Sequence, residues 1–451
     1  GDKTKEENMI SQKELSISNS LKLHKRAKKV LPGGVNASAR LNPTIEQAIF
    51  MKKAEGAYVY DVDKNKYIDF WNSHGATFLG HGHPAIVKAV NEILEIGILC
   101  AAETDLQVEV AENLVDMFPG MEMVRYSGSG TETTWHALRI ARAYTGKMGV
   151  AKFEGHFHGV NDTVGFSCWP PLEKAGTAKN PLSVPESGGI PVSNSELVTV
   201  LPFNDIETLE TTLRLNANKL GALIMEPVNY NSCGITPTSD FLSAVRTLTR
   251  DLGIVLIFDE ILSGFRINLG SAVSNTNIIP DMTILGKALG GGMPISAFMG
   301  TREIMETCIP NGPVVHSGTY NAHLVGIAAV KAFLEEVSRP NFYENINTIG
   351  EHLYSSMCEI FNRRNLKAWV QGKGSRFGLL FGIDSEPLNY RDTLRQDMNM
   401  MSAFNIACLK RGLYMLHWSP HHGYSSAHSM KDIEESLDII DQASKEVSSN
   451  T

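Results

Sequence analysis

Short apolar segments alternate with longer amphipathic ones through most of the chain, and this alternation most constrains the fold. The apolar segments have the length of buried strands, and the amphipathic segments place apolar residues at helical spacing. Strands joined by helices build a parallel sheet covered on both faces, and ligands bind such a sheet at the carboxyl ends of its strands. The predicted strands are residues 124–126, 149–153, 222–225, 254–258 and 282–285, and the predicted helices are residues 84–96, 106–117, 132–144 and 239–250.

We therefore expect an α/β protein with two domains. Residues 61–325 form the large domain, which contains the mostly parallel central sheet. Both ends of the chain, residues 1–60 and 326–451, combine into a smaller α+β domain, and the polar residues 1–20 are expected to be loosely attached. The predicted strands of this domain are residues 49–53, 57–61, 368–371, 377–383 and 413–416, and its predicted helices lie near residues 322–337, 400–411 and 430–444.

The charge balance argues against several classes of partner. With a net charge of −8 and a pI near 6.0, the chain has no general attraction for nucleic acid or for an anionic membrane. No apolar run reaches the length of a transmembrane helix, and the polar N-terminus does not resemble a signal peptide. The six cysteines have no paired spacing, which indicates reduced thiols in a cytoplasmic enzyme rather than a disulfide framework or a zinc site.

Lys287 occupies an unusual place for an ammonium group. It follows the apolar strand at residues 282–285, and the three glycines at 290–292 let the backbone turn tightly just beyond it. Burial lowers the pKa of a lysine and makes its amine nucleophilic, which is the state needed to form a Schiff base. The alternative is a surface lysine on a glycine-rich loop.

Ser129, Gly130 and Thr131 lie where a predicted strand passes into a helix, and they have the character of a phosphate site. The start of a helix offers backbone N–H groups and a positive dipole end, and these residues add two hydroxyls. Because the Gly-Lys-Ser/Thr of a nucleotide P-loop is missing, a small phosphate monoester fits better than a nucleotide. A plain helix N-cap is the alternative.

Three further residues end neighbouring strands. Asp259 is placed to hold a protonated ring nitrogen, Glu226 closes a strand, and Phe157 could stack on an aromatic ring. An N-cap or metal ligand is the alternative for Asp259, and a core position is the alternative for Phe157. A lysine, an aspartate, a phosphate loop and a stacking aromatic at the strand ends of one sheet together describe a pyridoxal phosphate site.

The motifs around these residues resemble those of a known family. Leu-Ile-Phe-Asp-Glu-Ile at 256–261, Gly-Phe-Arg at 264–266 and Leu-Gly-Lys at 285–287 are similar to the signature of class III aminotransferases of fold type I. The resemblance extends from Leu31 to about Ile440. It implies that Lys287 holds the cofactor as a Schiff base and transfers protons, and that Asp259 contacts the pyridine nitrogen.

The same resemblance implies roles for the other candidate residues. Ser129, Gly130 and Thr131 would bind the phosphate, and Phe157 and Ile261 would enclose the ring. The His-Ser-Gly-Thr at 316–319 is similar to a segment that crosses the dimer interface in the family. There, Thr319 would bind the phosphate held by the other subunit, so the resemblance implies a homodimer with shared active sites.

Two branches of the family compete. Leu-Pro-Gly-Gly-Val-Asn at 31–36 with Arg40 resembles glutamate-1-semialdehyde 2,1-aminomutases, in which the matching arginine binds the substrate carboxylate. Asn231, five residues after Glu226, also matches the aminomutase pattern, and both are expected at the cofactor. However, Val315 replaces the expected active-site tyrosine, and Pro-His-His-Gly-Tyr at 420–424 replaces a segment that carries a glutamate. His-Ser-Gly-Thr-Tyr-Asn at 316–321 instead resembles β-amino-acid aminotransferases.

These departures favour ordinary transamination, because an aminomutase must retain a diamino compound while its two nitrogens exchange. We expect an aminotransferase that acts on an amino acid bearing a carboxylate, with β-amino acids among the candidates. The aminomutase is the main alternative, and an amino-acid racemase on the same scaffold is a less favoured one. A non-catalytic homologue is disfavoured because Lys287 and Asp259 are both present. Arg376 is a rival to Arg40 for the carboxylate. No metal site is expected, since the histidine pairs His81 and His83 or His421 and His422 lack a carboxylate at helical spacing.

Overall fold

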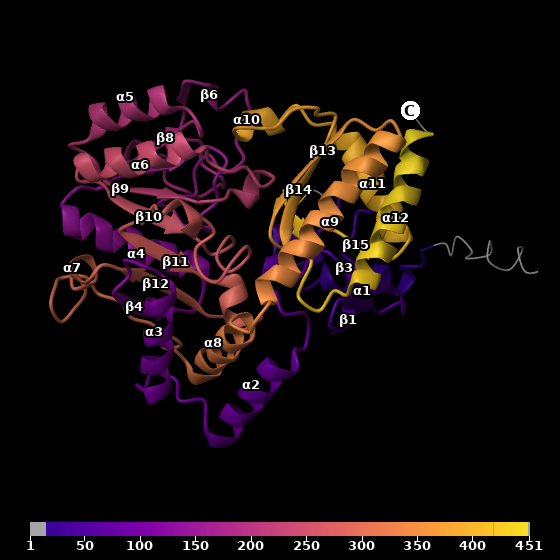
Figure 1. The fold of residues 1–451 in the computed structure, drawn as a ribbon, viewed down its shortest axis with the longest axis horizontal. Helices are drawn as coiled ribbons and strands as arrows, with labels where there is room; N and C mark the ends of the chain where they lie inside the picture. Colours follow the sequence, from indigo (N-terminus) through magenta and orange to yellow (C-terminus); the bar gives the residue numbers. More distant parts are fainter. Residues whose placement is uncertain (1–14, 418, 450–451) are drawn as a thin grey trace, which may run out of the picture.

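A seven-stranded sheet forms the centre of the larger part of the molecule (Figure 1). The structure is a computed structural model, and it describes residues 15–417 and 419–449; most of the predicted loose segment, residues 1–20, lies outside these ranges. The strand order is β4 (Met123–Ser127), β12 (Ser296–Gly300), β11 (Met282–Leu285), β10 (Val255–Asp259), β9 (Leu220–Met225), β5 (Gly149–Phe153) and β8 (Val198–Leu201).

The direction of the strands brings their carboxyl ends to one edge. Strands β11, β10, β9, β5 and β8 pair in parallel, while β12 pairs antiparallel with both β11 and β4. Because β12 alone is reversed, β4 runs in the same direction as the other five strands. The predicted α/β fold with a mostly parallel sheet is confirmed.

Helices cover both faces of this sheet, which explains why a central strand such as β9 is apolar on both of its faces. Along β9, Ala222 and Ile224 pack into the core under α4 (Gly130–Thr145), and Leu223 and Met225 pack into the core beneath α5 (Ile206–Asn216) and α6 (Ser239–Asp251). Figure 1 shows α5 and α6 on one side of the sheet and α4 on the other. The two faces thus bury alternate residues of the same strand.

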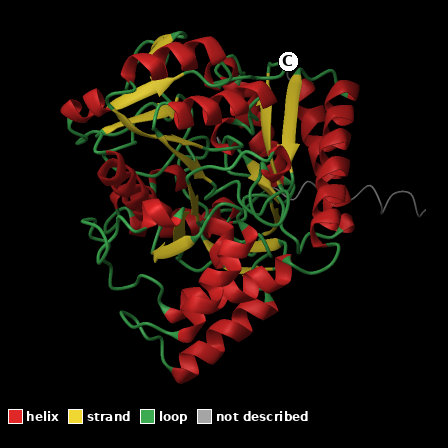
Figure 2. Cartoon of the chain, turned by 60° about the vertical axis from the view of Figure 1, so that its left-hand side comes forward, coloured by secondary structure: helices red, strands yellow, loops and turns green. Residues whose placement is uncertain are grey.

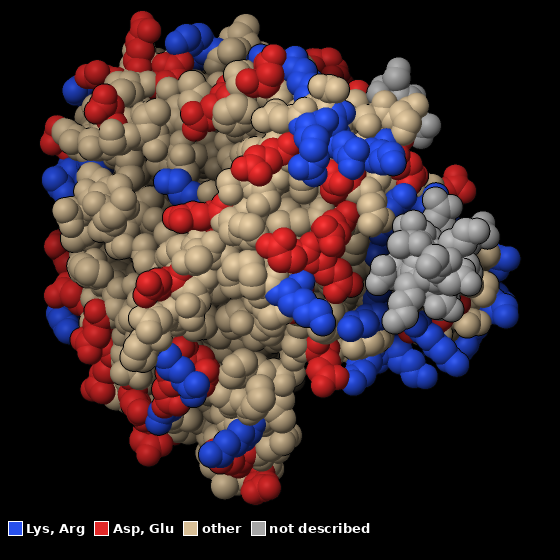
Figure 3. All heavy atoms as spheres, turned by 45° about the vertical axis from the view of Figure 1, so that its right-hand side comes forward, with Lys and Arg blue, Asp and Glu red and all other residues tan. Residues whose placement is uncertain are grey.

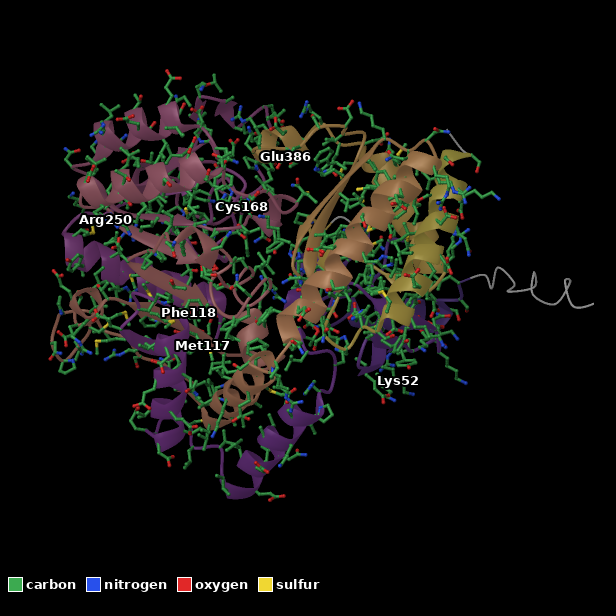
Figure 4. All side chains as sticks on the ribbon, in the orientation of Figure 1. Lys52, Met117, Phe118, Cys168, Arg250 and Glu386 are labelled. Atoms are coloured by element: carbon green, nitrogen blue, oxygen red, sulfur yellow. The ribbon has the colours of Figure 1, made fainter. Side chains whose placement is uncertain are left out.

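Three helices form the lower part of the molecule in Figure 1, below the sheet: α2 (Pro84–Ile96), α3 (Asp105–Met117) and α8 (Leu324–Val337). Phe118 follows α3, at the position marked in Figure 4, and packs edge-on against Phe265 with ring centroids 5.6 Å apart. Phe265 in turn meets Phe333 of α8 at 5.3 Å. These aromatic contacts join the lower helices to the segment that follows β10.

The N-terminal and C-terminal regions of the chain meet in a four-stranded sheet, in which β15 (Leu413–Tyr414) pairs in parallel with β3 (Lys66–Asp69). The other two strands are β1 (Met51–Glu55) and β2 (Tyr58–Asp61). A second sheet contains β13 (Ala368–Lys373), β14 (Arg376–Phe381) and β16 (His422–Gly423). The helices α9 (Phe342–Arg363), α11 (Met398–Lys410) and α12 (Met430–Ser448) stack beside these strands, as Figure 2 also shows.

One short helix of the C-terminal region, α10 (Tyr390–Thr393), reaches across to the seven-stranded sheet (Figure 1). Its Arg391 forms a two-point ion pair with Glu154, with Nε 2.8 Å from Oε1 and Nη2 3.0 Å from Oε2. The same guanidinium donates to the carbonyls of Ala175 and Gly176. Bidentate pairs of this kind are among the stronger side-chain contacts.

The remaining elements are peripheral: α1 (Ser18–Ala27), α7 (Arg302–Met305), β6 (Gly176–Thr177) and β7 (Asn180–Pro181). On the face in Figure 3, acidic and basic side chains are interspersed over most of the surface. Among the described residues, no helix is both long and apolar enough to span a bilayer.

Most predicted elements occur within two residues of their expected bounds, but β3, β8, β12, α5, α9 and several elements of two to four residues were not predicted. The longest of these, α9, has 22 residues. Its polar residues are frequent, and its apolar face is recognisable only from the core residues Leu353, Met357 and Phe361 that it buries against the small sheets. Tertiary packing therefore decides this helix more than its local sequence does.

Candidate active site

Five strands of the central sheet deliver candidate residues to its carboxyl edge. The segment after β4 carries Ser129 to Thr131, β5 leads to Phe157, and β9 leads to Glu226. Asp259 ends β10 and Lys287 follows β11. Since these strands run in the same direction, the predicted residues gather at one edge, as expected for a ligand site in an open α/β sheet.

Lys287 is the first residue of a short 3₁₀ helix, Lys287–Gly290 (η7). Its φ of 45° is uncommon for a residue with a side chain, and such strained conformations concentrate at functional sites. Burial lowers the pKa of Lys287 to about 8, although the carboxylates of Asp259 and Glu226 act in the opposite direction. The amine therefore carries far more of its neutral, nucleophilic form near pH 7 than a surface lysine does.

Asp259 is almost completely buried and is fixed on two sides. Its Oδ2 lies 2.7 Å from Nδ1 of His158, and its Oδ1 accepts a hydrogen bond from the backbone N–H of Ile261 at 3.1 Å. Burial lowers the pKa of His158, while Asp259 opposes that shift. A neutral His158 that donates from Nδ1 holds the Asp259 carboxyl group in a fixed orientation. Such a carboxylate is suited to hold a protonated ring nitrogen.

Glu226 organises the loops on either side of it. Its Oε2 accepts the backbone N–H of Phe157 at 2.9 Å, and its Oε1 accepts Nδ2 of Asn231 at 2.6 Å. Burial and the nearby Asp259 raise the pKa of Glu226 to about 8. Asn231 holds Trp169 through its backbone carbonyl, and the Trp169 ring stacks on Phe157 at 5.2 Å. Phe157 is thus supported from behind by a second aromatic ring.

The start of α4 has the expected features of an anion site. Ser129 is the N-cap, and its hydroxyl accepts the N–H of Glu132. The hydroxyl of Thr131 accepts the N–H of Val160 at 3.2 Å, which joins this turn to the loop that carries Phe157. The first N–H groups of a helix have no acceptor within the helix, so they are available to a phosphate.

Ile261 links the helix start to the lysine. A Cβ on Gly130 would lie 2.9 Å from Ile261 Cδ1, and a Cβ on Gly286 would lie 3.2 Å from Ile261 Cγ2. Both glycines therefore leave room that a side chain would fill. A helix start, a buried carboxylate and a lysine of lowered pKa around this cradle fit the phosphate, the ring nitrogen and the aldehyde of pyridoxal phosphate.

The two arginine candidates differ in burial. Arg40 ends a short 3₁₀ helix, Ser38–Arg40, and is exposed; it lines a groove together with Asn405 and Tyr414. Arg376 is completely buried, and its guanidinium donates to Nδ1 of His421.

The pKa of His74 is lowered to about 3, mainly by burial and also by the positive charges of Lys287, Arg376 and Arg40. His74 therefore lies within electrostatic reach of Lys287 and of both arginines.

The segment that contains Thr319 is exposed on the isolated chain. Val315 is 57% exposed and Tyr320 is 67% exposed, which are high values for large apolar side chains. Next to them, Nε2 of His316 lies 3.1 Å from Nδ2 of Asn321. Thr319 itself is exposed, and its predicted role at the phosphate of the other subunit stays a prediction.

Three of the four histidines considered as metal ligands have other partners, whereas neither ring nitrogen of buried His422 has a hydrogen-bond partner among the described residues. Nε2 of His81 lies 2.7 Å from Oδ2 of Asp69, His83 caps α2, and His421 accepts from Arg376. No group of three or more metal-binding side chains occurs within the described ranges. The main residue that the sequence analysis missed is His158, whose position two residues after Phe157 at a strand end was the available signal.

Comparison with known proteins gives a consistent picture. A family model described as aminotransferase class III matches residues 40–420. A glutamate-1-semialdehyde 2,1-aminomutase from Methanosarcina acetivorans is 36% identical over 427 residues, which cover 94% of this chain and 98% of that protein.

Among solved structures, an omega-transaminase from Sphaerobacter thermophilus has a TM-score of 0.90 and 30% identity, covering 95% of this chain and 97% of its own. A β-phenylalanine aminotransferase from Variovorax paradoxus has a TM-score of 0.84 and 26% identity, covering 94% of this chain and 93% of its own. A further transaminase structure, 29% identical with a TM-score of 0.87 and covering 97% of this chain and 99% of its own, has pyridoxal phosphate bound.

Proposed function

The chain belongs to the class III aminotransferase family, and we propose on that basis that it moves an amino group between a carboxylate-bearing amino acid and a keto acid. The family and the cofactor predicted from the sequence, pyridoxal 5′-phosphate, are confirmed. β-Amino acids are among the candidate donors, because the segment at 316–321 resembles that of β-amino-acid aminotransferases and a structural relative acts on β-phenylalanine.

The observation that carries transamination is the segment at 420–424. Where the aminomutase pattern has a glutamate, this chain has buried histidines, and His421 is used to hold Arg376. Val315, in place of the expected tyrosine, is exposed and apolar. Without these polar groups, the site has fewer means of retaining a diamino compound, and release of a keto acid product is favoured.

Each residue at the strand ends has its own role in the proposed reaction. The bound cofactor supplies a ring that withdraws electrons from the substrate Cα. Lys287 holds the cofactor and moves the Cα proton, which its lowered pKa permits near neutral pH. Asp259, oriented by His158, keeps the ring nitrogen protonated, while Ser129, Gly130 and Thr131 bind the phosphate. Phe157 and Ile261 position the ring, and Glu226 with Asn231 supports Phe157.

Arg40 is proposed to bind the substrate carboxylate. It is exposed, it is not committed to an ion pair among the described residues, and it lies within electrostatic reach of His74 beside Lys287. A guanidinium offers a planar pair of N–H donors that matches a carboxylate. We further propose a cytoplasmic homodimer in which Thr319 contacts the phosphate of the other subunit; the exposed apolar Val315 and Tyr320 support an interface there.

The aminomutase is the second candidate, because the Methanosarcina acetivorans protein that matches over 427 residues is named glutamate-1-semialdehyde 2,1-aminomutase. A panel of amino donors given to the holoenzyme in single turnover separates the two. A transaminase converts the cofactor to its amine form with α- or β-amino acids and releases a keto acid that mass spectrometry detects. Turnover of glutamate-1-semialdehyde to 5-aminolevulinate, with no keto acid from any other donor, would refute our proposal.

The role of Arg40 has its own test. Arg40→Lys keeps the charge but loses the planar fork, so KM for carboxylate substrates should rise on the order of tenfold or more, whereas amines without a carboxylate should be little affected. Arg214→Lys, on the exposed surface of α5, is the matched control. An unchanged KM in Arg40→Lys would remove Arg40 from the site.

A further inference from the structure

Lys152 is a buried lysine in the middle of the central sheet, and nothing in the proposed reaction uses it. It is the fourth residue of β5, and it is 0% exposed. Its neighbours across the sheet are Val200 of β8 and Ile224 of β9. An amine between aliphatic side chains is uncommon, because its loss of hydration is costly unless each N–H finds an acceptor.

Three acceptors surround the amine of Lys152. Its Nζ donates to the carbonyl of His156 at 2.8 Å and to the carbonyl of Phe166, and Sγ of Cys168, labelled in Figure 4, lies 3.6 Å away. These acceptors match the three N–H donors of an ammonium group. Within the described ranges, Lys152 has no carboxylate partner. All its hydrogen bonds go to residues 154–168, which we call the β5 loop.

The two carbonyls belong to opposite ends of the β5 loop. His156 lies near its start and Phe166 near its end, and both residues are completely buried. In the part of the chain that the structure describes, no backbone N–H donates to either carbonyl. Next to them, the backbone N–H of Gly155 donates to the carbonyl of Ser167 at 3.0 Å. Lys152 therefore satisfies both buried carbonyls and closes the base of the loop.

The β5 loop carries two residues that the proposed reaction depends on. Phe157 positions the cofactor ring, and Nδ1 of His158 lies 2.7 Å from the carboxylate of Asp259. Farther along the loop, the backbone N–H of Val160 donates to the hydroxyl of Thr131 at 3.2 Å. The middle of the loop is thus attached to the candidate cofactor site, and its base is attached to β5.

A lysine at this position fixes the loop in a way that an apolar residue does not. An aliphatic side chain would fill the space between Val200 and Ile224 with no charge to desolvate, but it would leave both carbonyls without a donor. Because β5 is paired on both sides, the amine of Lys152 is held by a rigid element. His156 directly precedes Phe157, so a shift of its carbonyl would move the stacking ring.

We propose that Lys152 is a positioning residue that closes the base of the β5 loop and thereby fixes Phe157 and His158 at the cofactor. The inference rests on the proposed function for what these two residues contact. Lys152 itself touches neither the cofactor nor the reacting atoms, and it acts through the two carbonyls that it holds.

Lys152→Met tests the proposal, because it keeps an unbranched apolar side chain and removes all three donors. In hydrogen–deuterium exchange of the holoenzyme, peptides of the β5 loop should exchange at least about tenfold faster, while peptides of α4 and β9 stay within about threefold of wild type. The visible circular dichroism of the bound cofactor, which reports the orientation of its ring, should change. The kcat for amino transfer should fall roughly 10- to 100-fold, with KM for the amino donor changed by less than about threefold.

Lys147→Met is the matched control. Lys147 lies just before β5, at the end of the strand opposite to the site, and its Nζ donates to the carbonyl of Ala217 at 2.9 Å. The substitution therefore also removes a bond from a lysine to a carbonyl, but it does so away from the β5 loop. Exchange in the β5 loop, the circular dichroism of the cofactor and kcat should all stay at their wild-type values.

Unchanged exchange in the β5 loop of Lys152→Met would overturn the proposal. Equal acceleration in the loop, α4 and β9 would overturn it as well, because that pattern shows a general loss of stability. If Lys152→Met does not fold, the wild-type protein decides the matter. In native-state exchange at increasing denaturant, the β5 loop and β5 should open at the same free energy. A loop that opens well before β5 would show that Lys152 does not close it.

The proposed function can fail separately. If the β5 loop loosens in Lys152→Met but the wild-type protein transfers no amino group from any donor, the proposed transamination is refuted and the closure of the loop by Lys152 stands. If the wild-type protein is an active transaminase and Lys152→Met keeps both its loop protection and its rate, only the role of Lys152 is refuted.

Discussion

The titration of Lys287 can be displaced in opposite directions by two single substitutions. The pKa of Lys287 is lowered from 10.5 to about 8; burial is the largest cause, Asp259 and Glu226 oppose the shift, and Arg266 and Arg376 contribute to it. A shift from 10.5 to about 8 increases the neutral fraction of the amine at pH 7 roughly 300-fold. Removing the negative charge in Asp259→Asn should lower the pKa below 8, and removing the positive charge in Arg376→Gln should raise it above 8.

The assay is brief acetylation of the cofactor-free protein at a series of pH values, followed by mass spectrometry of the Lys287 peptide. Only the neutral amine reacts, so the labelling rate of Lys287 should rise about tenfold per pH unit up to pH 8 and level off above it. Exposed Lys53, whose pKa is raised by its hydrogen bond to Glu55, provides the internal control and should keep rising beyond pH 10.

The outcome that would contradict this reasoning is equally definite. If Lys287 levels off together with Lys53, burial does not shift its pKa. If both substitutions move the midpoint in the same direction, the midpoint reports a general loosening of the site and not the charges around the amine. Circular dichroism of each variant provides the folding control.

Four further results are expected. Lys287→Ala should abolish transamination while the circular dichroism spectrum stays unchanged, and any retained turnover would remove Lys287 from its catalytic role. Asp259→Asn should slow the reaction by about 10²- to 10³-fold in stopped-flow assays and leave cofactor bound through the phosphate, whereas a near-normal rate would contradict its role. Thr319→Ala should weaken cofactor retention on dilution, and a fully loaded, active monomer in analytical ultracentrifugation would disprove the shared site. Gly130→Ala should weaken cofactor binding because its Cβ would lie 2.9 Å from Cδ1 of Ile261, and Ile261→Val in the same chain should restore it; lack of rescue would place the effect elsewhere.

Local sequence was sufficient to predict those site residues that combine a reactive side chain with a position at the end of a strand. Asp259 ends an apolar strand, and Lys287 follows a mostly apolar strand and a glycine; such short apolar segments can be recognised without knowledge of the fold. Strand β12 was missed because Ser296–Gly300 is short and contains a serine and a glycine. Its antiparallel position between β4 and β11 depends on pairing with residues that are distant in sequence.

The partners of buried charged groups could not be obtained in this way. Arg376 was a candidate for the substrate carboxylate, but its contact with His421 spans 45 residues and requires β14 and β16 to pair. His158 was likewise passed over, since its bond to Asp259 spans 101 residues. Spacing along the chain cannot reveal an unpaired guanidinium, because that property depends on which carboxylates fold nearby and which do not.

The ion pair between Arg391 and Glu154 has a mechanical consequence. Glu154 stands three residues before Phe157, so the loop that supports the ring is anchored to α10 by the two-point contact. If the C-terminal helices rotated against the central sheet, the ion pair between Arg391 and Glu154 would either break or serve as the pivot. Because breaking a pair that is largely shielded from water is costly, a displacement of α10 would be transmitted to the loop that carries Phe157.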